Sequence, residues 1–198
     1  MNNVPLSWGK CTIFIKDLGT DNAKWKKLAT PVEDSTNLAS TQGDKLEAKI
    51  EGGENEAVKY KKNTYQLTYN IRKAQGRNQP MANTDGVVKN EYAVLLLPED
   101  ASTDGFYIER TSANIQDNFT TAEGAIWQVT HDALSPSTEG TNTVKWGKVT
   151  VVDKVENDVP TRTVDFHEND EMLAEGQAKP DGIGPVSFDA PQAFEYND

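Results

Sequence analysis

The amino-acid sequence predicts a mostly β protein: an antiparallel β-sandwich or barrel with a long hairpin and at most one or two short helices. Several segments alternate apolar and polar residues, which is the period of a half-buried strand. The run from Tyr92 to Leu97 is continuously apolar and ends at Pro98, as expected of a strand buried on both faces. Turn residues separate these segments at short intervals, which favours an all-β fold.

The alternating segments can be placed individually. In 64–73 the apolar residues recur at every second position, whereas at 100° per residue they would scatter around a helix. The same period occurs in 10–16, 45–51 and 125–129, and a short apolar segment at 106–110 follows the turn Asp104-Gly105. Each of these segments is predicted to be a strand.

One segment changes parity part way along. Val144 and Trp146 occupy even positions, whereas Val149 and Val151 occupy odd ones. A β-bulge inserts one residue and reverses the parity, and glycine tolerates the local conformation. The sequence therefore predicts a bulge at Gly147-Lys148.

The hairpin 45–62 allows a prediction of register. A two-residue turn at Gly52-Gly53 would place apolar residues opposite polar ones, and Glu51 opposite Glu54. A three-residue loop gives a register one residue longer, which pairs Leu46 with Tyr60, Ala48 with Val58 and Glu47 with Lys59. Because register follows the hydrophobic pattern, we predict this longer register, in which the numbers of paired residues add to 106.

Helical signals are few. Thr120 and Glu123 have the spacing of a capping box, but the strand pattern of 125–129 competes with a helix there, and we prefer the strand. One helical turn could follow Pro31.

Charge divides the chain at about residue 153. The net charge is −11, and residues 153–198 contribute −9 of it, with twelve acidic and three basic side chains. We therefore predict a domain over 1–152 and an acidic, Pro/Gly-rich extension over 153–198. Two interpretations of the extension stay open: a disordered acidic tail, or an arm that docks its aromatic residues on a neighbouring subunit. The candidate docking residues are Phe166, Phe188, Phe194 and Tyr196.

Composition limits the function. A net charge of −11 argues against ordinary binding of nucleic-acid phosphates. Cys11 is the one cysteine, so an intramolecular disulfide is excluded, and its parity with Ile13 predicts a buried apolar role. No stretch approaches the roughly 20 apolar residues of a membrane span, and no export signal is seen, so we expect a soluble protein that folds in a cytosol.

We find no constellation that indicates a metal, a cofactor or a catalytic site. Gly52-Gly53 lacks the lysine and following helix of a phosphate loop. His131 continues the apolar parity of 127–129 and is predicted to be a partly buried, hydrogen-bonded strand residue. His167 lies in an acidic run that lacks the glycine spacing of a calcium loop.

Two other classes of function stay open. A pair of carboxylates for glycoside hydrolysis would meet in space and cannot be identified from spacing, so a deep pocket with a raised-pKa acid would favour a hydrolase. Four tryptophans, Trp8, Trp25, Trp127 and Trp146, could line the face of a carbohydrate-binding or adhesin-like β-sandwich module. In β proteins such residues more often belong to the core or to an interface.

A set of segments within about residues 5–152 is characteristic when taken together. They are Leu6-Ser7-Trp8-Gly9-Lys10-Cys11-Thr12-Ile13, Trp25, Thr30-Pro31-Val32-Glu33-Asp34-Ser35-Thr36, Gly43-Asp44-Lys45-Leu46-Glu47-Ala48-Lys49-Ile50-Glu51-Gly52-Gly53-Glu54, the strand Asn63 to Arg72, Leu97-Pro98-Glu99-Asp100 and Gly105-Phe106. With these segments the sequence resembles the major tail, or tail tube, proteins of bacteriophages and prophages of gut Bacteroidetes. The segment 153–198 has no counterpart in this resemblance.

The resemblance implies a structural virion protein. Tail tube proteins form rings of six copies, which stack into a hollow tube that conducts phage DNA, and the needle tube of type VI secretion has a similar fold. The implied partners are further copies of the chain, other tail proteins and DNA that passes without specific binding. No enzyme activity, cofactor or membrane is implied, and the expected location is the virion tail, after synthesis in the bacterial host cytoplasm. The candidate assembly residues lie in the 45–62 hairpin: Glu47, Glu51, Gly52, Gly53, Glu54 and Lys59.

Overall fold

The computed structural model describes residues 9–21, 23–100, 102–156, 159–168 and 192–195. Within these residues the secondary structure consists of strands, and none of them forms a helix able to cross a membrane. The twelve strands are β1 (Cys11–Asp17), β2 (Trp25–Lys27), β3 (Asn37–Thr41), β4 (Lys45–Lys49), β5 (Asn55–Tyr60), β6 (Thr64–Arg72), β7 (Val87–Pro98), β8 (Gly105–Thr120), β9 (Gly124–Ala133), β10 (Val144–Glu156), β11 (Val159–Glu168) and β12 (Gln192–Glu195).

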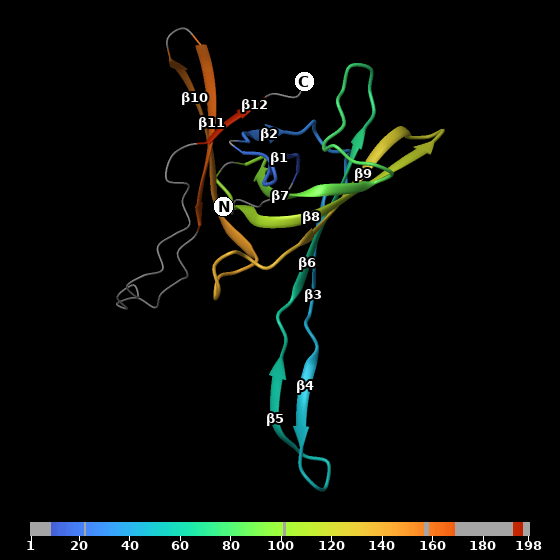
Figure 1. The fold of residues 1–198 in the computed structure, drawn as a ribbon, viewed down its shortest axis with the longest axis vertical. Helices are drawn as coiled ribbons and strands as arrows, with labels where there is room; N and C mark the ends of the chain where they lie inside the picture. Colours follow the sequence, from blue (N-terminus) through green and yellow to red (C-terminus); the bar gives the residue numbers. More distant parts are fainter. Residues whose placement is uncertain (1–8, 22, 101, 157–158, 169–191, 196–198) are drawn as a thin grey trace, which may run out of the picture.

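Ten strands form one sheet in the order β10-β11-β12-β2-β1-β7-β8-β9-β6-β3, and β10 also pairs with β8. The pairings are antiparallel except between β12 and β2. The remaining strands, β4 and β5, form a two-stranded sheet that extends away from the others (Figure 1). The mostly β, antiparallel fold predicted from the sequence is confirmed.

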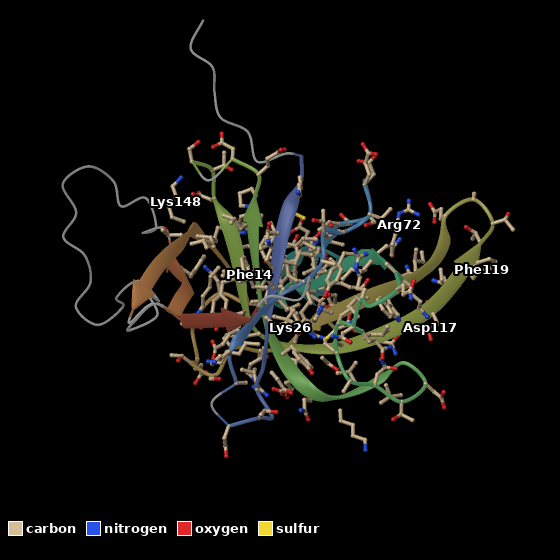
Figure 2. All side chains as sticks on the ribbon, turned by 90° about the horizontal axis from the view of Figure 1, so that it is seen from above. Phe14, Lys26, Arg72, Asp117, Phe119 and Lys148 are labelled. Carbon is tan, nitrogen blue, oxygen red and sulfur yellow. The ribbon has the colours of Figure 1, made fainter. Side chains whose placement is uncertain are left out.

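The central strands β1, β7 and β8 bury both of their faces, and alternate residues enter two different cores. Ile13, Val94 and Ile108 lie in the first core with side chains from β6 and β9. Phe14 and Leu95 lie in the second with Val149 of β10. Phe14, which interrupts the polar face of β1 in the sequence, is therefore a core residue near the centre of the molecule (Figure 2). This packing on both sides of the central strands is that of a sandwich.

A polar network joins four strands, β6 to β9, inside the first core. His131 is fully buried, more deeply than the sequence predicts. The Thr111 hydroxyl donates to the Tyr92 carbonyl at 2.8 Å and lies 2.9 Å from Nδ1 of His131. Because the single hydrogen of that hydroxyl is donated to the Tyr92 carbonyl, the hydroxyl oxygen can only accept from His131. Nδ1 therefore carries a hydrogen and donates it to this oxygen. Nε2 then accepts from the Tyr69 hydroxyl at 3.0 Å, so the imidazole is neutral and both nitrogens are satisfied.

The predicted bulge at Gly147-Lys148 is wrong. β10 pairs in continuous register, with β8 over Val144 to Gly147 and with β11 from Gly147 onwards. Val144 faces the first core and Val149 faces the second, so plain alternation explains the change of parity. Trp146 shares the parity of Val144 but is half exposed, and it packs against Phe106.

The preference for a strand after Thr120 is confirmed. The Thr120 hydroxyl does accept a hydrogen bond from the Glu123 amide, at 3.1 Å, as in a capping box. Here it closes the turn between β8 and β9, where Gly124 has a φ of 76°. The same spacing of a hydroxyl and a later amide therefore serves a hairpin turn. The segment after Pro31 contains a turn, closed by Ser35 and Val32, and no helix.

The boundary predicted at residue 152 falls within a strand. β10 continues to Glu156 and pairs with β11 from Gly147 to that end. β12 then pairs with both β11 and β2. The described parts of the acidic segment therefore extend the main sheet.

Candidate assembly surface

The hairpin over residues 43–63, here called the arm, projects from the sheet in line with β3 and β6 (Figure 1). Every residue of β4 and β5 is exposed to solvent. Four of the eight large exposed hydrophobic side chains in the described part of the chain belong to the arm: Leu46, Ile50, Val58 and Tyr60, each 46–53% exposed. An isolated two-stranded hairpin is marginal in water, so this surface is suited to a partner.

The predicted register of the arm is wrong by one residue. Leu46 lies opposite Lys59 and Glu47 lies opposite Val58, so the paired numbers add to 105. The loop does have three residues, Glu51 to Gly53, closed by bonds of Ile50 with Gly53 and Glu54. An irregularity between Ala48 and Lys49 then shifts the stem by one. Glu56 is left unmatched at this irregularity.

The observed register places apolar side chains on both faces of the arm. Leu46 and Ala48 share one face, because residues two apart point the same way. Val58 and Tyr60 point to the other, opposite Glu47 and Lys45. Since neither face is covered by the body, no core selects the register that would gather these side chains together. The arm can therefore contact partners on two sides.

The candidate assembly residues occupy different parts of the arm. The Glu47 carboxylate accepts a hydrogen bond from Lys45, and this bond holds the pKa of the carboxyl below the ordinary value. Lys59 lies opposite Leu46, so it does not form the predicted pair with Glu47. Gly52 and Gly53 form the loop with φ of 103° and 87°, values that favour glycine, and Glu51 and Glu54 flank them.

The neck of the arm depends on Gly43. A Cβ at this position would lie 2.2 Å from the Lys61 carbonyl oxygen and 2.4 Å from that of Lys62. We therefore expect Gly43→Ala to open the neck and weaken the bond from the Lys61 amide to the Asp44 carbonyl, now 2.9 Å. Amide hydrogen exchange in β4 and β5 should become at least several-fold faster, while Gln42→Ala leaves it unchanged. Equal exchange rates in both variants would contradict this role.

The four candidate docking aromatics have different locations. Phe166 is fully buried and packs against Tyr107 at a ring-centroid distance of 5.5 Å, so it belongs to the core of its own subunit and does not reach a neighbour. Phe194 lies in β12, where it pairs with Trp25. Phe188 and Tyr196 lie outside the described residues.

The most exposed of the large apolar side chains in the described residues lies outside the arm and was not predicted from the sequence. Phe119, 72% exposed, lies near the turn between β8 and β9, far from the centre of the molecule (Figure 2). Nearby contacts brace this hairpin: Lys73 pairs with Asp117 at 2.7 Å, and Asn118 donates to Gln128 at 2.9 Å. Phe119 keeps the parity of the buried Ile115, so its exposure depends on where the neighbouring strands end, which the sequence does not reveal.

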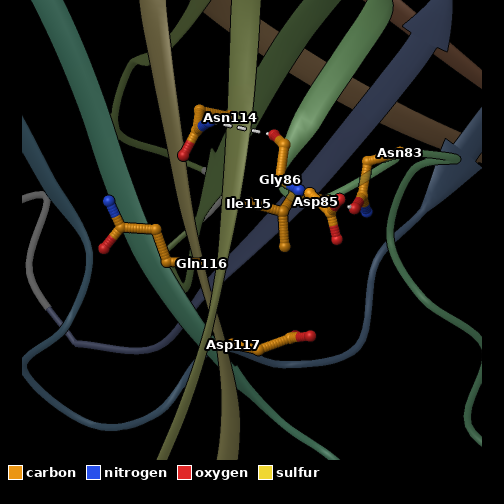
Figure 3. Close-up of a pocket in the computed structure, with 7 residues that line it drawn as sticks. All are labelled: Asn83, Asp85, Gly86, Asn114, Ile115, Gln116 and Asp117. Atoms are coloured by element: carbon orange, nitrogen blue, oxygen red, sulfur yellow. Dashed lines mark hydrogen bonds between the residues drawn. The ribbon is translucent and has the colours of Figure 1, made fainter.

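A hollow of about 490 Å³ lies between the 83–86 loop and β8 (Figure 3). Two of its asparagines bond to Gly86: Asn83 accepts from the Gly86 amide and Asn114 donates to its carbonyl. Its residues include no aromatic ring on which a sugar would stack: Asn83, Asp85, Gly86, Asn114, Ile115, Gln116 and Asp117. Trp25 and Trp127 are buried in the cores, whereas Trp8 lies outside the described residues.

Several carboxyl groups have displaced pKa values. A hydrogen bond from Arg110 lowers the pKa of Glu91, and one from Ser102 lowers that of Asp100. These displacements are opposite in direction to that of a general acid in a glycosidase. Within the described residues, no group of three or more His, Cys, Asp or Glu side chains has the arrangement of a metal site.

The chain matches no protein-family model and no curated protein sequence. The resemblance to tail tube proteins given above therefore stays a prediction from the sequence.

Proposed function

We propose that the chain is a structural subunit that assembles with copies of itself into rings, and that the rings stack into a phage tail tube that conducts DNA. The observation that carries this proposal is the arm. Its side chains add nothing to either core of the subunit, yet it exposes apolar surface on both faces. Such a surface contributes little to the stability of the isolated subunit. It stabilises an assembly when a partner covers it.

The outer edge of the main sheet supports the same proposal. Within the described residues the sheet ends at β3, whose sequence Asn37 to Thr41 contains neither proline nor charge. Natural proteins usually block such an edge, because its free backbone groups pair with strands of other chains. In the proposed ring, a strand of the neighbouring subunit covers this edge. Repetition of the contact between different surfaces closes a ring when the rotation permits.

The charge of the chain suits the proposed conduit. A net charge of −11 lets DNA pass without adhering to the protein. Six copies to a ring, and other tail proteins at the ends of the tube, follow from the resemblance and belong to the proposal.

The test is size-exclusion chromatography with light scattering at rising protein concentration, with negative-stain imaging of the heaviest fraction. We expect a shift from monomer to rings, and tubes at high concentration. A monomer at every concentration, with neither rings nor tubes in the images, would overturn the proposal.

A further inference from the structure

The charges of the arm are segregated along its length. The tip, residues 50–58, carries Glu51, Glu54 and Glu56 and no basic residue, a net charge of −3. The root, residues 43–49 and 59–63, carries five lysines against Asp44 and Glu47, a net charge of +3. The arm is therefore neutral as a whole, with an acidic end and a basic end of equal size.

Contacts within the arm leave both ends with surplus charge. Asp44 pairs with Lys61 at 2.8 Å, and Glu47 contacts Lys45 and, at 3.6 Å, Lys49. Both acids of the root are thus paired inside the root. Within the described part of the chain, ion pairs are absent for the three tip glutamates and for Lys59 and Lys62.

The register leaves the surplus charges without an ionic partner across the hairpin, whereas the pair Asp44–Lys61 joins its two sides at the root. Lys59 lies opposite Leu46, and Lys49 lies opposite Asn55. Opposite charges placed across the strands would contribute to hairpin stability, whereas three glutamates around one turn repel each other. A basic surface on another molecule would remove this repulsion.

We infer that, in the assembly, the acidic tip of one subunit's arm lies against the basic root of the arm of the neighbouring subunit. This rests on the proposed function. The occupant is a second copy because the root supplies the charge that the tip lacks, in equal amount. Exposed apolar side chains accompany both ends, with Ile50 at the tip and Leu46 and Tyr60 at the root. Tip and root are different surfaces, so the contact repeats from copy to copy.

The test uses charge reversal at each end. Glu54→Lys with Glu56→Lys changes the tip from −3 to +1, and Lys59→Glu with Lys62→Glu changes the root from +3 to −1. Each double variant alone should need a protein concentration for assembly on the order of tenfold higher than the wild type. Two rescues are expected: the quadruple variant should assemble alone, and the two double variants should assemble when mixed in equal amounts.

Matched controls separate this contact from net charge. Lys89→Glu and Glu33→Lys change exposed charges elsewhere and should leave assembly unchanged. Thermal unfolding of every variant checks that the monomer folds. Assembly of both double variants at the wild-type concentration would overturn the inference, and so would failure of both rescues, which would place the tip or the root against another surface. A wild type that never assembles would refute the proposed function, and this inference with it, before any variant is examined.

Discussion

Replacing His131 with alanine is expected to lower the free energy of unfolding by about 3–5 kcal/mol. The substitution leaves a cavity at a fully buried site and removes the acceptor of the Tyr69 hydroxyl. A loss of this size is large beside the usual roughly 5–15 kcal/mol of a domain. Urea unfolding of the monomer, followed by tryptophan fluorescence, measures it.

The control is Gln128→Ala, on the same strand, which removes a half-buried acceptor of a bond from Asn118 and should cost less than about 1.5 kcal/mol. Equal losses of unfolding free energy in the two variants would show that the buried network stabilises the fold no more than a half-buried hydrogen bond does.

The pH dependence of stability gives an independent signature of His131. Burial lowers the pKa of His131 from 6.5 to about 3. Between these values the unfolded chain binds a proton that the folded chain excludes, so the free energy of unfolding falls as the pH falls, by roughly 1 kcal/mol per pH unit. His131→Ala should lack this contribution. The clearest comparison is from pH 6.5 to 4.5, above the range in which Glu91, with its lowered pKa, begins to contribute.

Replacing Leu46 and Tyr60 together with serine is expected to raise the protein concentration needed for assembly by about 30- to 100-fold. The two side chains lie on opposite faces of the arm and are each about half exposed in the subunit. Covering the exposed halves is worth roughly 2–3 kcal/mol in total, which gives that factor. Light scattering at stepped concentrations measures it.

The same double variant should leave the stability of the monomer within about 0.5 kcal/mol of the wild type, because neither side chain contacts a core. Val87→Ser, which changes an apolar side chain that is 60% exposed outside the arm, is the control and should assemble normally. If the serine variant assembled at the wild-type concentration, the arm would not be part of the interface between subunits.

Strand positions were predictable because the two-residue alternation of apolar and polar residues can be recognised within one short segment. The segment 64–73 buries Leu67, Tyr69 and Ile71, as its pattern predicts. The bulge in β10 was mispredicted because the argument assumed one buried face, whereas Val144 and Val149 face different cores. Whether a strand has one core or two depends on its neighbours, and these are distant in the sequence.

The arm shows the same limit for the candidate site. Its existence and the length of its loop follow from Gly52-Gly53 and the flanking alternation. Its register does not, because the hydrophobic pattern determines register only where a core covers one face. Phe166 was interpreted as an aromatic for docking because its acidic surroundings suggested exposure. Its burial depends on β11 returning to β10, a long-range pairing that local composition does not encode.

Because the arm is outside both cores, its sequence can diverge without loss of the fold. In the proposed assembly, substitutions in β4 and β5 would change which subunits recognise each other, while β1, β7 and β8 continue to pack as before. Related proteins made in one cell could thus keep separate assemblies by exchanging charges within one hairpin. Recognition and folding would then evolve under independent selection in a single polypeptide.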